Sequence, residues 1–126
     1  MNRRTTLTLT AVAAPALALA LSASTATADT TPGPAAAPET TAVTQAVRTS
    51  PATAGVPASQ YTVGHVRVAD GWAAADLEPT DTDALDPATA VLQLTGGTWT
   101  VVDLGTAQVG CGTVAAPVLD ALALSC

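Results

Sequence analysis

Apolar and polar residues alternate through the middle of this 126-residue chain, and the alternation predicts a β-sheet. Residues 61–68, 72–78, 89–94 and 98–104 are rich in β-forming residues and repeat with a period of two. Asp70-Gly71 divides the first two strands and Gly96-Gly97 the last two, and such glycine turns favour tight hairpins. We therefore predict four antiparallel strands in two hairpins, joined by an acidic loop over residues 80–87.

Helical spacing occurs on both sides of this predicted sheet. Val43, Ala46 and Val47 recur at helical intervals, which predicts a helix over residues 39–49. Pro117 begins a last helical stretch, in which the apolar positions are Val118, Leu119 and Leu122. The expected fold class is α+β: a small four-stranded antiparallel sheet with an N-terminal helix and a C-terminal helix.

Simple alternation also predicts which side chains share a face of the sheet. One face, expected to pack against the helices, carries Val66, Val68, Ala73, Ala75, Leu77, Leu92, Leu94, Val102 and Leu104. The two tryptophans, Trp72 and Trp99, are then predicted to lie on the opposite face. Tyr61, His65 and Arg67 should likewise share the wetter face.

The N-terminal segment has the layout of a secretory signal peptide over residues 1–28. Asn2-Arg3-Arg4 is followed by an apolar run, and Ala26-Thr27-Ala28 provides a small-residue cleavage site. An uncleaved membrane anchor is the alternative, but Thr8, Thr10 and Pro15 interrupt the run, and spanning needs about 20 predominantly apolar residues. We expect a Pro/Ala-rich linker over residues 29–38 and a single small domain over residues 39–126.

The charge of the predicted mature chain excludes several kinds of partner. All ten acidic residues lie from Asp29 onward, where the only basic residues are Arg48 and Arg67, so its formal charge is −8. Such a surface repels phosphate backbones and anionic lipid, so we expect no nucleic-acid partner. No second long apolar run follows, which predicts no stable membrane insertion after cleavage.

The two cysteines, Cys111 and Cys126, are predicted to form a structural disulfide that anchors the C-terminal helix. An exported protein meets an oxidising compartment, and a small core without Phe or Ile needs such a cross-link. A redox or metal pair is the alternative, but the spacing is far from Cys-x-x-Cys and no histidine lies nearby in the sequence. We expect no cofactor.

Roughly residues 60–126 share a pattern of motifs with a group of other proteins. The resemblance rests on the Gly-Trp at Trp72, on Trp-x-Val-Val-Asp-Leu-Gly-Thr from Trp99, and on the spacing of Cys111 and Cys126. In these features the chain resembles a group of small secreted actinobacterial proteins of unknown function. The resemblance supports the predicted compartment and fold, and it implies no activity and no catalytic residues.

Candidate chemistry in the sequence is sparse. His65 is the only histidine, and a general base needs an orienting partner and a nucleophile within reach. Asp81, Asp83 and Asp86, after Glu78, could offer oxygen ligands to Ca²⁺. The segment departs from the EF-hand pattern, because Leu85 stands where an acidic or amide residue belongs, so a solvated loop is expected and no metal site is predicted.

The remaining candidates are Trp72 and Trp99. Exposed tryptophans often anchor binding sites, whereas the cost of exposing such large apolar side chains favours a place in the core of a chain with few aromatic residues. We predict an extracellular, non-enzymatic protein that binds another extracellular protein or a cell-envelope component. The alternatives are an inhibitor of secreted proteases, acting through the loop at residues 79–88, and a small extracellular enzyme.

Overall fold

The computed structural model describes residues 33–126, so the predicted signal peptide lies outside the described residues. The elements in chain order are β1 (Gly33–Pro34), α1 (Ala37–Thr49), β2 (Tyr61–Ala69), β3 (Trp72–Pro79), β4 (Ala88–Thr95), β5 (Thr98–Gly105) and α2 (Ala116–Ala121). Two short 3₁₀ helices, η1 (Pro51–Thr53) and η2 (Ala58–Gln60), connect α1 to β2. None of the helices in this part of the chain is long and apolar enough to cross a membrane.

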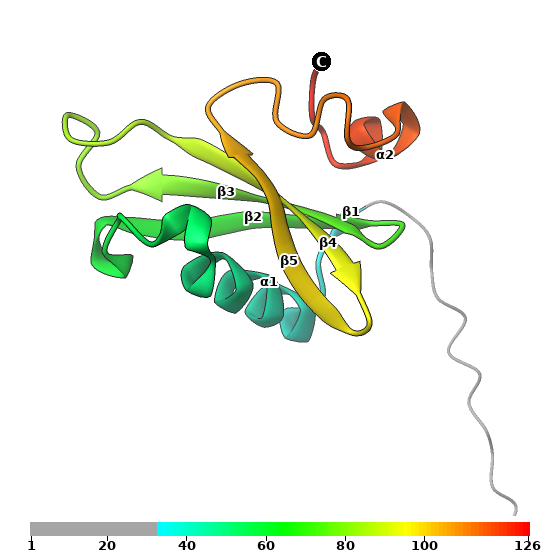
Figure 1. Ribbon diagram of the computed structural model, residues 1–126, viewed down its shortest axis with the longest axis horizontal. Coiled ribbons are helices and arrows are strands. Elements are labelled where there is room, and N and C mark those ends of the chain that lie inside the picture. Colours follow the sequence, from blue (N-terminus) through cyan, green and yellow to red (C-terminus); the bar gives the residue numbers. More distant parts are fainter. Residues whose placement is uncertain (1–32) are drawn as a thin grey trace, which may run out of the picture.

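Strands β2 to β5 form an antiparallel meander in which each strand pairs with the next (Figure 1). Both hairpins close through two-residue turns, Asp70–Gly71 and Gly96–Gly97, and all four of these residues have positive φ. A type I′ turn requires this conformation, and its twist matches that of the paired strands. The predicted α+β class is confirmed, with both hairpins and both flanking helices.

The described part of the predicted linker contributes to the sheet. β1 pairs with the end of β2, with Gly33 opposite Val68 and Pro34 opposite Arg67. This adds a fifth, two-residue strand to the four that were predicted.

Helix α1 begins two residues before its predicted start, at Ala37. Pro38 fits the first helical turn, where a backbone N–H would have no helical partner. The Glu39 carboxylate accepts a hydrogen bond from the Ala36 N–H at 3.3 Å and so caps the helix. The helix therefore includes the last residues of the segment predicted to be linker.

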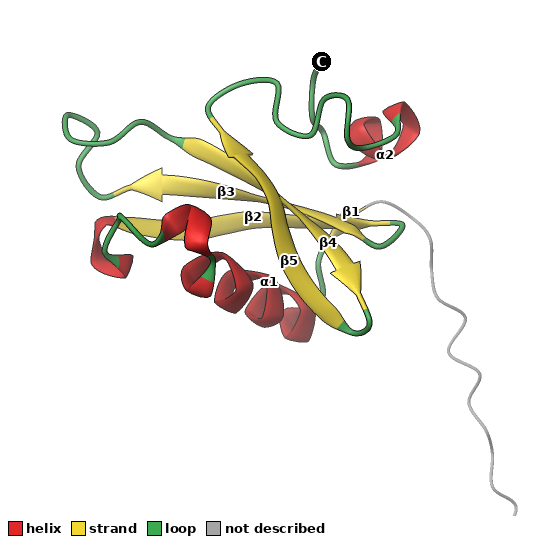
Figure 2. Ribbon diagram, in the orientation of Figure 1, coloured by secondary structure: helices red, strands yellow, loops and turns green. Residues whose placement is uncertain are grey.

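The sheet is covered on both faces (Figure 2): α1 lies on one face, and α2 with the C-terminal segment lies on the other. The α1 cluster consists of the buried residues Val43, Val47, Tyr61, Val66, Ala73, Ala75, Leu77, Ala90 and Leu92. The α2 cluster consists of Ala74, Val91, Val109, Val114, Val118, Leu119 and Leu122. Because the centre of β3 is covered on both faces, its three alanines are all buried and show no alternation.

A one-residue bulge in β5 corrects the predicted faces. Val91 pairs with Asp103 and Leu92 with Val101, so Val102 is an extra residue. The bulge reverses the alternation for the N-terminal half of β5. Val101 therefore packs against the α1 cluster, whereas Val102, predicted to face the helices, is 41% exposed.

The same bulge places Trp99 against the α1 cluster, while Trp72 packs against the α2 cluster. The prediction that both helices pack on one face and both tryptophans lie on the other is wrong, because α1 and α2 cover opposite faces and Trp99 lies on the α1 side. Leu94, the cross-strand neighbour of Trp99, was also expected inside but is 42% exposed near the hairpin tip.

A second bulge lies in β2. Gly64 pairs with Asp76 and Arg67 with Ala74, so β2 has one more residue than β3 in this interval. His65 lies in the bulge with a φ of 46°. The extra residue brings Tyr61 onto the α1 face, where it is buried, and corrects the prediction that Tyr61 shares a face with Arg67.

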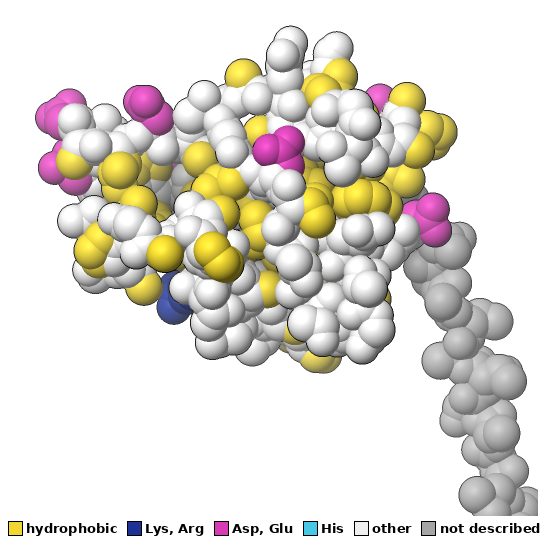
Figure 3. Space-filling view, in the orientation of Figure 1, with side chains coloured by type: hydrophobic (Ala, Val, Ile, Leu, Met, Phe, Trp, Pro, Cys, Tyr) yellow, Lys and Arg dark blue, Asp and Glu magenta, His cyan; other side chains and the backbone are white. Residues whose placement is uncertain are grey.

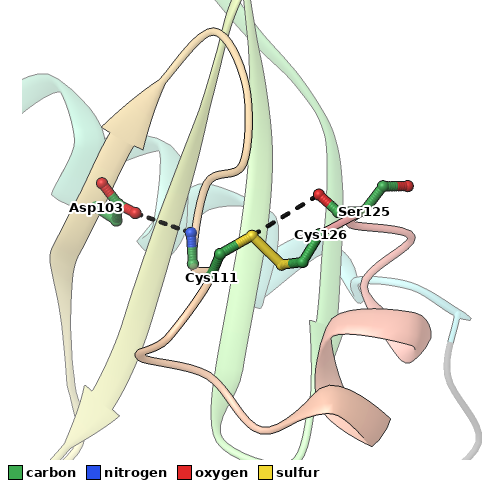
Figure 4. The surroundings of a disulfide bond; sticks show 5 residues. Asp103, Cys111, Ser125 and Cys126 are labelled. Atoms are coloured by element: carbon green, nitrogen blue, oxygen red, sulfur yellow. Dashed lines mark hydrogen bonds between the residues drawn. A yellow bond between two sulfur atoms is a disulfide. The ribbon is translucent and has the colours of Figure 1, made fainter.

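The disulfide between Cys111 and Cys126 is present, with the two Cα atoms 5.8 Å apart. It fixes the C-terminal residue to the loop that follows β5 (Figure 4). The Asp103 carboxylate accepts hydrogen bonds from the N–H groups of Leu104 and Gly110, at 2.9 and 2.8 Å. The Asp103 carboxylate therefore holds the loop that leads to α2 against the sheet, and the disulfide joins this loop to the segment after α2.

Candidate functional site

His65 belongs to a small polar cluster on the sheet face that α2 partly covers. The Arg67 guanidinium donates two hydrogen bonds to the Asp76 carboxylate at 3.1 and 3.2 Å, and Thr89 Oγ1 donates to Asp76 at 3.4 Å. His65 Nδ1 lies 3.6 Å from Asp76 Oδ2, and the imidazole side chain is 78% exposed. Asp76 is thus already engaged by Arg67, and this arrangement joins β2, β3 and β4 as an ion-pair network.

His65 is the candidate general base of the sequence. A general base needs a nucleophile within reach, and within residues 33–126 the ion-pair contact of this imidazole is with Asp76. Arg67 Nε is buried without a hydrogen-bond partner, while the rest of its guanidinium is occupied by Asp76.

Trp72 and Trp99, the candidate binding residues, lie on opposite faces of the sheet. Each is half-buried, and each packs against a different cluster. They therefore cannot form one shared aromatic platform.

The acidic loop between β3 and β4 is ordered by its own hydrogen bonds. Asp81 Oδ1 accepts from the Asp83 N–H at 2.9 Å, and the Asp81 carbonyl accepts from the Leu85 N–H at 3.1 Å. Within residues 33–126, no group of three or more histidine, cysteine or acidic side chains is placed to hold a metal ion.

We therefore expect millimolar calcium to leave the melting temperature of the protein almost unchanged. A site with a dissociation constant a hundredfold below the calcium concentration would stabilise the fold by about 2.7 kcal/mol, a clearly visible shift. Thermal unfolding followed by circular dichroism, with magnesium as the control cation, measures this. A large upward shift with calcium alone would contradict the expectation.

A small apolar hollow opens at the end of the sheet beyond the last turn of α1. Its volume is about 180 Å³. The buried side chains of Tyr61 and Leu77 form its floor, and Leu104 adds an apolar surface from β5. These three residues belong to the α1 cluster or pack against it, so the hollow is an opening into the core.

The two walls of the hollow come from separate loops. Ala52 of η1 and Val56 form one wall, and Leu85 and Asp86 of the acidic loop form the other. Small and apolar residues thus line most of the hollow, and a carboxylate stands at its edge.

Hydrogen bonds fix η1 and the start of the acidic loop, the two segments from which the walls extend. Buried Thr53 donates its hydroxyl to the Val47 carbonyl at 2.6 Å, which fixes η1 to the end of α1. Thr80 donates from its N–H to the Gln60 carbonyl at 2.8 Å and from its hydroxyl to the Ser59 carbonyl at 3.0 Å. The hollow is therefore preformed, which lowers the entropic cost of filling it.

The carboxylates of the acidic loop gather at this end of the molecule. Figure 3 shows them beside hydrophobic atoms that reach the surface. Asp81, Asp83 and Asp86 are exposed, and within residues 33–126 the only ion pairs are those of Asp76. The apolar hollow thus lies next to carboxylates without basic partners.

Sequence reasoning identified the acidic loop but missed the hollow. The lining residues come from five separate segments, and only the fold brings them together. One available signal was Leu85, the one large apolar side chain among the polar and acidic residues of the loop.

A shallow depression lies beside the disulfide. It has a volume of about 410 Å³ and lies between the loop after β5 and the last four residues.

Compared with known proteins, the chain matches no family model, no curated protein and no solved structure.

Proposed function

We propose that this chain is an exported, non-enzymatic binding protein whose partner is another extracellular protein or a cell-envelope component. The observation that carries the proposal is the preformed apolar hollow, which opens at the surface beside unpaired carboxylates. Small concave apolar sites with few polar groups are typical of places where a protein receives a side chain or ligand. We therefore place the proposed binding site at the hollow at the end of the sheet, and not at Trp72 and Trp99.

Export is supported by two independent features. The N-terminal residues follow the signal-peptide layout, and the Cys111–Cys126 disulfide is of the kind that persists in oxidising compartments. We infer an extracellular location, either released or loosely held at the envelope.

Protease inhibition is the second function to be tested. An inhibitory loop is usually held rigid, and the loop at residues 79–88 has internal hydrogen bonds but no disulfide. The loop also contributes Leu85 to the hollow, so its apolar residue faces its own domain. Stoichiometric loss of subtilisin-like or trypsin-like activity on adding the protein would favour inhibition over simple binding.

Affinity capture tests the binding function. The full chain, expressed in an exporting host and immobilised with its disulfide formed, is exposed to envelope extract and culture supernatant of the producing organism. Ala52→Trp places an indole at an exposed lining position of the hollow, and Ala42→Trp, on the exposed face of α1, is the matched control.

We expect a partner that the native chain and the Ala42→Trp variant retain and that the Ala52→Trp variant loses. A partner retained equally by all three proteins would place the binding site elsewhere. Capture of no partner at all would remove the support for a binding function.

A further inference from the structure

The geometry points to one kind of occupant for the hollow: an extended peptide segment with an aliphatic or aromatic side chain flanked by lysine or arginine. The apolar side chain would enter the hollow, and the flanking cations would lie over the β3–β4 loop. This inference rests on the proposed binding function and specifies the chemistry of the partner. It takes its support from the size, the lining and the charge surroundings of the hollow.

The size and lining of the hollow select the central side chain. An apolar cavity of about 150 Å³ accommodates a benzene molecule, so a hollow of about 180 Å³ has room for a leucine or a phenyl ring. Its floor of Tyr61 and Leu77 gives an apolar side chain a dry surface, whereas a buried polar group would lose its hydrogen bonds to water.

The negative charge around the hollow determines which residues should flank the central side chain of the peptide. Asp86 lines the hollow, and Asp81 and Asp83 are exposed on the same loop. Within the described residues none of the three has a basic partner, and Arg67 is already paired with Asp76. A cationic segment would relieve the repulsion among these carboxylates, and an anionic ligand such as a fatty acid would increase it.

The apolar hollow and the carboxylates of the acidic loop are close enough for one extended peptide segment to contact both. Leu85 and Asp86 are adjacent in the loop, and both line the hollow. A side chain buried against Leu85 is therefore within one or two residues of Asp86, because an extended chain advances about 3.3 Å per residue. Neighbouring cations on the same segment can reach the carboxylates without leaving the surface.

Residue-resolved NMR titration of the full chain with three capped pentapeptides tests this inference. The first has a central leucine flanked by two lysines on each side, the second has glutamates in place of the lysines, and the third has a central glycine between the lysines. We expect the first to bind at least about tenfold more tightly than either of the others, because each lacks one half of the recognition. Its chemical-shift changes should centre on Tyr61, Leu77 and Leu85.

Variants separate the apolar from the electrostatic contribution. Ala52→Trp should weaken the leucine–lysine peptide by about tenfold or more, and Ala42→Trp should leave its affinity unchanged. Asp83→Asn combined with Asp86→Asn should weaken it by about three- to tenfold. The double variant should also prefer the lysine peptide over the glutamate peptide less strongly than the native chain does. The native chain should lose the same preference in 1 M salt, which screens the charges.

Three results would overturn the inference: equal binding of the lysine and glutamate peptides, equal binding of the leucine and glycine peptides, or shift changes away from the hollow. A partner captured at the hollow, combined with no preference among the peptides, would overturn the inference and leave the binding function standing. If the peptides show this selectivity at the hollow but affinity capture finds no partner, the inferred chemistry of the occupant is supported. The failed capture then counts only against the proposed function.

Discussion

Replacing Leu92 with alanine is expected to lower the free energy of unfolding by about 2–5 kcal/mol. Leu92 is fully buried in the α1 cluster, so its removal leaves a cavity beneath α1. Leu94 lies two residues away on the same strand but is 42% exposed, and Leu94→Ala should cost about 1 kcal/mol or less. Urea denaturation of the two variants and the native protein measures both effects.

This pair of variants tests how far α1 covers the sheet, because simple alternation places both leucines on the same face and treats them as equivalent. Equal destabilisation by both substitutions would mean that the sheet end near the β4–β5 turn is covered, contrary to the structure. A small effect of Leu92→Ala would contradict the position of α1 on this face.

Removing the disulfide is expected to destabilise the fold by about 2–4 kcal/mol. The bond links residues 15 positions apart, and a loop of about that length contributes about 3 kcal/mol through the lowered entropy of the unfolded chain. The double variant Cys111→Ala, Cys126→Ala avoids a reactive free thiol. The four-stranded meander should persist, because the α1 cluster contains neither cysteine.

Thermal and urea unfolding of this double variant, with far-ultraviolet circular dichroism for secondary structure, check the expectation. The native protein treated with a reductant is the matched control and should lose similar stability. Unfolding curves that coincide with those of the oxidised native protein, or two titratable thiols in the exported protein, would refute the structural role of the bond.

The strands and turns could be predicted because their signals are local. Asp70-Gly71 and Gly96-Gly97 take positive φ at the predicted positions, and the alternating segments form the predicted strands. The pairing of Cys111 with Cys126 could also be predicted, because the composition of the chain and its expected compartment both favour a disulfide.

The bulges could not be predicted from alternation. Each adds one residue to a single strand, and the sequence around His65 or Val102 looks like uninterrupted strand. A single extra residue exchanges the two faces for the rest of that strand, which explains why Tyr61 and Trp99 lie on the α1 side. For Tyr61, Trp99 and Val102 the error was therefore in the phase of the alternation, whereas the strand positions were right.

The candidate site was the least accessible feature. Short-range patterns identified the acidic loop, but the hollow depends on where α1 ends and on how η1 and the β3–β4 loop are held around Tyr61 and Leu77. These are long-range contacts of the folded chain, and no residue type marks them. The prediction of Trp72 and Trp99 as binding residues depended on side-chain size, which also suits packing in the core.

Hydrogen–deuterium exchange of the native chain with its captured partner tests the central proposal most directly. We predict protection confined to the two walls and floor of the hollow, in residues 52–61 and 77–88, and loss of this protection in the Ala52→Trp variant. Protection confined to the α2 face or the C-terminal segment, with residues 52–61 and 77–88 unchanged, would contradict the proposal that the partner binds at the end of the sheet.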